Sequence, residues 1–118
     1  MVEHLTDNIV TMNPEDFKKL VKDYTTEDVS SDEPHVTMRC QENSITLDKV
    51  KHIILDQDTN LVRIIRDRPD VYKLYYRLNM RRELKIVIDL LTHKKINIRT
   101  VKILDGLYHI GSVRRQRF

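Results

Sequence analysis

Residues 70–91 read DVYKLYYRLNMRRELKIVIDLL, and the structure expected for this stretch decides the fold predicted for the whole chain. Apolar residues recur in it at helical steps and fall into two groups. The groups are Val71, Leu74, Tyr75 and Leu78, and then Met80, Leu84, Val87 and Leu91. Because the stripe loses its register near Asn79, we expect a long helix that is either bent or buried on several sides.

Basic residues follow a second regular spacing through the same stretch. Lys73, Arg77, Arg81 and Lys85 recur at constant four-residue steps, and Tyr72 and Tyr76 lie beside them in the sequence. On a helix, side chains four residues apart lie nearly above one another, so the row predicts a ridge of positive charge about 18 Å long. Such a ridge suits the phosphates of a nucleic acid or an acidic partner. The alternative is a solvated helix face neutralised by acidic residues elsewhere. The predicted binding residues are Lys73, Arg77, Arg81, Lys85, Tyr72 and Tyr76, with the tail residues Arg114, Arg115 and Arg117.

Helix-start signals recur along the rest of the chain. Each is a capping side chain followed by apolar residues at helical steps. Asn13, Thr46 and Asn97 are such caps, and they predict helices over residues 14–24, 47–54 and 98–110. A further short helix is expected over residues 61–65, and it ends before Pro69 because the residue preceding a proline disfavours helix.

One segment shows the two-residue period of a strand instead. Val36, Met38 and Cys40 are apolar and alternate with polar residues. The predicted fold is therefore mainly α, a compact bundle of four or five helices with a small β-hairpin or strand near residues 35–47. We expect a single domain over residues 1–118, with an extended arm at 1–12, an acidic loop at 25–34 and a basic tail at 112–118. In the loop, Ser30 and Ser31 beside acidic residues fit the pattern of an acid-directed kinase, although a plain solvated loop is the simpler interpretation.

The formal net charge of +3 conceals a division between the two halves of the chain. Residues 1–60 contain 13 acidic and 6 basic residues, whereas residues 61–118 contain 5 acidic and 15 basic residues. The halves can pair within one molecule, pair between copies, or present the basic half to an anion.

The composition also disfavours several classes of protein. A single cysteine allows no intramolecular disulfide, which fits a reducing compartment. No stretch approaches the roughly 18 apolar residues that span a bilayer, and the N-terminal residues do not resemble a signal peptide. We therefore expect a soluble intracellular protein of the cytoplasm or nucleus, with no membrane contact. Scattered histidines and only two glycines predict no metal site, no phosphate-cradling loop and no cofactor.

The residues lead to a ranked set of functions. The first is a small non-enzymatic interaction or assembly subunit that works through charged surfaces, with a partner protein or copies of itself as partner. The alternative is a DNA- or RNA-binding protein or transcription regulator that uses the basic half. A small enzyme assembled from distant residues is the second alternative, although no catalytic residue and no small-molecule substrate are predicted. The absence of Ala beside abundant Ile, Asp, Asn and Lys is typical of AT-rich coding, as in many viruses and phages.

Overall fold

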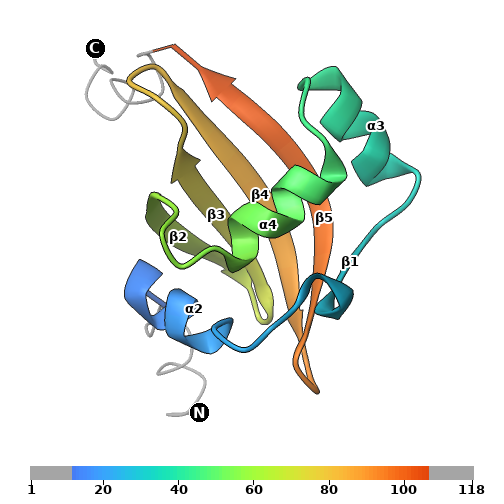
Figure 1. Cartoon of the computed structure of the whole chain (residues 1–118), viewed down its shortest axis with the longest axis vertical. Helices are drawn as coiled ribbons and strands as arrows, with labels where there is room; N and C mark the ends of the chain where they lie inside the picture. Colours follow the sequence, from blue (N-terminus) through green and yellow to red (C-terminus); the bar gives the residue numbers. More distant parts are fainter. Residues whose placement is uncertain (1–11, 107–118) are drawn as a thin grey trace.

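The computed structural model describes residues 12–106 of the 118-residue chain and shows a five-stranded sheet with helices along one face (Figure 1). The strand order is β1-β5-β4-β3-β2, in which β1 runs parallel to β5 and every other neighbouring pair is antiparallel. The elements are α2 (Pro14–Leu20), the 3-10 helix η1 (Thr26–Asp28), β1 (Val29–Ser31), α3 (His35–Glu42), α4 (Leu47–Leu55), β2 (Leu61–Arg68), β3 (Val71–Arg77), β4 (Arg82–Leu91) and β5 (Lys95–Asp105).

The predicted helical bundle is wrong, and the decisive error lies in residues 70–91. This stretch forms β3, a turn and β4. In β4 every second residue from Leu84 to Leu90 is apolar and lies in or against the core. This is the two-residue period of a strand with one face turned to the core. Valine, isoleucine and tyrosine dominate both strands and favour the extended conformation. The predicted helices over 61–65 and 98–110 are likewise wrong in the part that the structure describes, where β2 and β5 lie.

The turns between these strands are short, and those from β2 to β3 and from β4 to β5 contain residues other than glycine with positive φ. His93 and Lys94 both have φ of 61° and lie in the three-residue loop between β4 and β5, where Leu91 pairs with Lys95. Asp70, with φ of 70°, closes the loop from β2 to β3. Between β3 and β4 the Asn79 side chain accepts hydrogen bonds from the backbone N–H groups of Arg81 and Arg82. The sheet is therefore an antiparallel meander to which β1 adds a parallel edge.

The segment predicted as a strand near residues 35–47 forms α3 and the start of α4, so that prediction is also wrong. Val36 and Cys40 are buried four residues apart on one face of α3, whereas Met38 between them is 53% exposed. The apparent alternation was therefore one buried helical face interrupted by an exposed methionine.

The helix starts at Asn13 and Thr46 are confirmed. Asn13 and Asp16 form a reciprocal capping box at the start of α2, and the Thr46 side chain accepts from the N–H of Lys49 at the start of α4. The predicted acidic loop at 25–34 contains η1 and β1. Within the arm predicted at 1–12 only Met12 is described, and the tail predicted at 112–118 lies outside the described residues.

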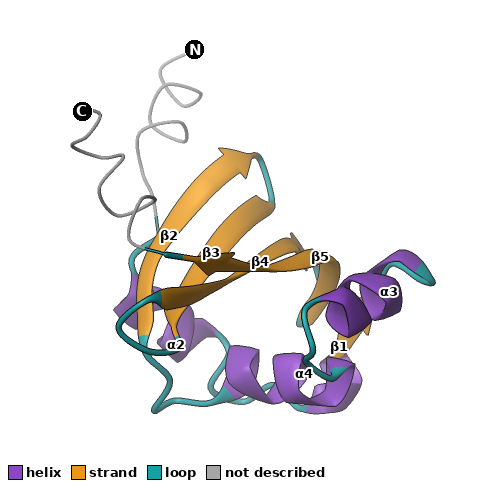
Figure 2. Ribbon diagram, turned by 90° about the horizontal axis from the view of Figure 1, so that it is seen from above, coloured by secondary structure: helices purple, strands orange, loops and turns teal. Residues whose placement is uncertain are grey.

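The core lies between the helices and one face of the sheet (Figure 2). Its residues come from α2, α3 and α4 on one side and from all five strands on the other. The opposite face of the sheet has no helix over it among residues 12–106, and we call it the open face. Within the same residues no helix has the length and apolar character needed to cross a membrane.

Candidate functional site

Lysines cross the open face of the sheet from strand to strand. In the register, Tyr75 of β3 lies opposite Lys85 of β4, and Lys85 lies opposite Lys102 of β5. Lys73 of β3 belongs to the adjacent row, diagonal to Lys85. Side chains directly opposite have Cβ atoms about 5 Å apart and diagonal neighbours about 7 Å apart. We call Lys73, Lys85 and Lys102 the lysine row.

Little negative charge balances the lysine row. Lys73 lies 3.9 Å from a carboxylate oxygen of Asp67, but neither Lys85 nor Lys102 has a carboxylate within 4.0 Å among residues 12–106. Burial lowers the pKa of Lys85 and the ammonium groups of Lys73 and Lys102 lower it further, while the Asp67 carboxylate opposes the shift without cancelling it. Like charges directly opposite on a sheet are destabilising, so the arrangement costs stability unless an anion relieves the repulsion. Arrangements that cost stability, such as these adjacent like charges, occur in natural proteins mainly at functional sites.

The arginines of the open face, in contrast, have carboxylate partners. Glu83, which is 1% exposed, lies 3.3 Å and 3.4 Å from two guanidinium nitrogens of Arg63 and 3.6 Å from one of Arg77. The Arg63 guanidinium also stacks on the ring of Tyr75, 4.0 Å from its centroid. Farther along the face, Arg99 donates to Asp89 at 3.2 Å.

A polar network joins this face to the parallel edge strand. The Asn97 side-chain amide donates to Asp89 and to Asp32, and its oxygen accepts from the Ser30 hydroxyl. Ser30 therefore helps to attach β1 to β5.

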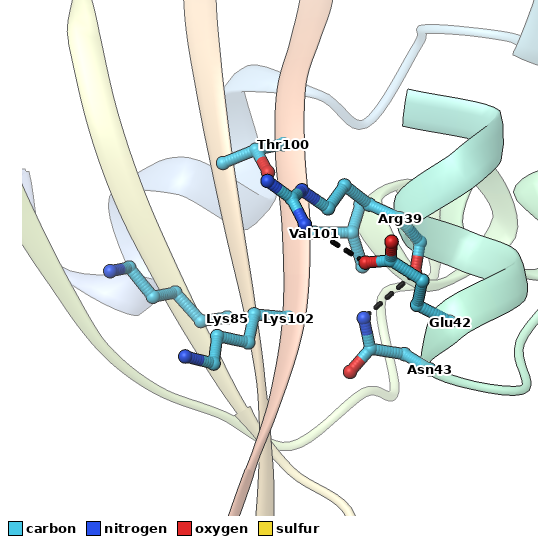
Figure 3. A pocket seen from close by; sticks show the side chains of 7 residues that line it. All are labelled: Arg39, Glu42, Asn43, Lys85, Thr100, Val101 and Lys102. Carbon is cyan, nitrogen blue, oxygen red and sulfur yellow. Dashed lines mark hydrogen bonds and ion pairs between the residues drawn. The ribbon is translucent and has the colours of Figure 1, made fainter. Parts of the chain in front are cut away.

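A cavity of about 340 Å³ lies beside the later part of β5, beyond the residues that pair with β1 and at the end of the lysine row. Arg39 extends from α3 toward Thr100, while Lys85 and Lys102 extend beside each other from the neighbouring strands (Figure 3). Glu42 lies at the same edge and pairs with Arg39 at 2.9 Å. Asn43 fixes this wall, since its side-chain oxygen accepts from the Ile103 N–H and its amide donates to the Arg39 carbonyl oxygen. The remaining lining residue is Val101.

The structure brings together some of the predicted binding residues and separates others. Lys73 and Arg77 lie on the open face of β3 together because a four-residue step is a multiple of the two-residue strand period. Lys85 lies on the same face because it pairs with Tyr75 across β3 and β4. Arg81 lies in the turn after β3. Tyr72 and Tyr76 lie on the opposite face, packed in or against the core, so they do not flank the lysines. The three tail residues Arg114, Arg115 and Arg117 are outside the described range.

Sequence reasoning missed two residues that the fold adds to the site. Lys102 comes from β5 and Arg39 from α3. The alternation of Leu84, Ile86, Ile88 and Leu90 would have placed Lys85 on a solvent-facing row of a strand. No local signal in the sequence indicates that Lys102 or Arg39 lies near it, because these contacts depend on strand register.

Tyr76 gives a test of the core. Its hydroxyl is buried without a hydrogen-bond partner among the described residues, and burial raises the pKa of this hydroxyl far above its usual value. A buried polar group without a partner costs about 1–3 kcal/mol. Tyr76→Phe is therefore expected to leave the free energy of unfolding unchanged or raise it by about 1 kcal/mol in urea denaturation. A loss above about 1 kcal/mol would mean that the hydroxyl has a partner in the folded protein.

Within residues 12–106, no three His, Cys, Asp or Glu side chains gather in a way that suits a metal ion. Comparison with protein-family models, with curated proteins and with solved structures finds no significant match to this chain.

Proposed function

We propose that the protein is a non-enzymatic module that binds single-stranded nucleic acid across the open face of its sheet. The observation that carries this proposal is the lysine row, which places three ammonium groups on three adjacent strands with little compensating negative charge. Lysine is a flexible point charge that suits phosphate without demanding one geometry. Phosphate contacts of this kind supply most sequence-independent affinity for nucleic acids.

Arg63 favours a single strand over a duplex. Its guanidinium lies over the Tyr75 ring and donates to the Glu83 carboxylate, and 44% of its side chain remains exposed. Arginine planes stack on unpaired bases, which a duplex keeps inside its own stack. The lysine row would then hold phosphates while Arg63 supports a base on the same face.

The test is a titration of the full chain with labelled single-stranded RNA, single-stranded DNA and duplex DNA, followed by fluorescence anisotropy between 50 and 300 mM salt. Three phosphate contacts to a single strand predict a slope of log K against log salt of about −2. Equal or tighter binding of the duplex would contradict the role of Arg63. Absence of binding at low salt, or binding without salt dependence, would overturn the proposal.

A second candidate is assembly of copies of the chain or docking of an acidic protein. It is favoured by the charges of the two layers: residues 12–60, which supply the helices, contain 11 acidic and 6 basic residues, whereas residues 61–106, which supply β2 to β5, contain 5 and 12. An acidic helical layer of one copy can face the basic open face of the next. Light scattering without nucleic acid separates the candidates, because this assembly grows as salt is lowered.

A further inference from the structure

We propose that the cavity beside α3 holds the terminal phosphate of the bound strand, with Arg39, Lys85 and Lys102 as the residues that bind it. The inference rests on the proposed function and extends it, because it gives the strand an end point on the open face.

The cavity lies at the end of the path that a strand bound along the lysine row would follow. The lysine row runs from Lys73 on β3 to Lys102 on β5 and so leads toward the β5 edge. There β1 pairs with the first part of β5, and α3 follows along the later part, attached through Asn43 and Ile103 (Figure 1). A strand that follows the lysines therefore meets α3 at the cavity.

The net charge of the residues that line the cavity suits a terminal phosphate. Arg39, Lys85 and Lys102 contribute three positive charges and Glu42 one negative charge, which leaves an excess of two. A terminal phosphate carries about −1.5 to −2 near neutral pH, whereas an internal phosphodiester carries only one negative charge. The cavity thus matches a phosphomonoester better than the middle of a strand. The lowered pKa of Lys85 is consistent with a site that gains stability when an anion enters.

The pair formed by Arg39 and Glu42 does not prevent binding. Both side chains are about half exposed, at 47% and 56%, and exposed ion pairs are weak. A planar guanidinium forms two parallel hydrogen bonds with phosphate, so phosphate competes well for Arg39. Thr100 lies beside Arg39 and offers a hydroxyl donor. The volume of about 340 Å³ is at the lower end of the range for small-molecule sites, enough for a phosphate and part of its sugar.

The experiment compares three oligonucleotides of one sequence, with a 5′-phosphate, a 3′-phosphate or hydroxyls at both ends. We expect one phosphorylated end to tighten binding to the full chain about tenfold, as for one added charge-assisted contact. Arg39→Gln and Lys102→Glu should each abolish this preference. Lys102→Glu places opposite charges across β4 and β5, so its melting temperature should not fall. Lys49→Glu makes the same charge change at an exposed position of α4, far from the lysine row in the sequence. It is the matched control and should keep the preference.

A second measurement separates this inference from the proposed function. Inorganic phosphate and a mononucleotide are titrated into the isotope-labelled chain, and amide shifts are followed by NMR. Shifts centred on Thr100, Lys102 and Arg39 support the cavity as a phosphate site even when no oligonucleotide binds, in which case only the nucleic-acid proposal falls. If oligonucleotides bind equally with and without a terminal phosphate, or inorganic phosphate leaves these amides unmoved, the inference is wrong while the proposed function stands.

Discussion

Replacing Ile86 with Ala is expected to lower the free energy of unfolding by about 2–5 kcal/mol. Ile86 lies in β4, which has a strand on each side, and its side chain is fully buried against the helical layer. The substitution removes buried methyl groups and leaves a cavity that the strands on both sides cannot fill. Domains of this size are stable by only about 5–15 kcal/mol, so the loss should be plain in urea denaturation followed by circular dichroism.

Val87→Ala is the matched control, because the same strand turns Val87 to the open face, where it is only half-buried. We expect this change to cost less than about 1.5 kcal/mol. The helical interpretation of residues 70–91 predicts the opposite order, since it places Val87 in the apolar stripe and Ile86 outside it. If Val87→Ala is the more damaging change, the strand register of β4 is incorrect.

The parts of the fold that could be predicted from the sequence are those fixed by local chemistry. Asn13 and Thr46 begin helices because each side chain accepts a hydrogen bond from a backbone N–H three residues ahead. Such an interaction needs no distant partner, so the local sequence is enough to indicate it. The same is true of the break after α4, where Asp56 to Asn60 form a turn region.

The sheet could not be predicted in this way because its signals are ambiguous over short distances. The steps from Lys73 to Arg77 and from Val71 to Tyr75 fit one face of a helix and also one face of a strand. The hairpin at His93 and Lys94 lacks the glycine that usually marks such a turn. In β5 the register shifts at Arg99, so the buried residues change from Ile96 and Ile98 to Val101. Because of the extra residue, the buried Ile98 and Val101 are three positions apart, which is also a helical step.

The candidate site was predictable in charge but not in geometry. Lys73 and Lys85 were identified from their spacing, and the structure places both on the open face. Lys102 and Arg39 join them only because β4 pairs with β5 and α3 follows the β5 edge. The prediction that Tyr72 and Tyr76 flank the lysines is wrong for a different reason: on a strand, neighbours in sequence point to opposite faces.

Replacing all three lysines of the row with Gln is expected to have the largest effect on binding. Removal of three phosphate contacts should reduce the slope of log K against log salt by about 2 for a single strand. At that slope the wild-type chain loses roughly 20-fold in affinity between 50 and 200 mM salt, so the triple variant should be nearly insensitive over this range. Anisotropy titrations of both proteins with one single-stranded oligonucleotide measure the difference.

The loss of salt dependence shows direct contact with phosphates only if changes in stability and in net charge are excluded as its cause. The triple variant removes repulsion between Lys85 and its neighbours, so its free energy of unfolding should be equal to or above that of the wild type. Lys18, Lys19 and Lys49 lie on α2 and α4, away from the open face, and their joint replacement by Gln changes the net charge equally. If that control flattens the salt dependence as much as the triple variant does, binding follows overall charge and the lysine row is not the interface. If only the row variant loses the slope, the ammonium groups of β3, β4 and β5 contact the phosphates.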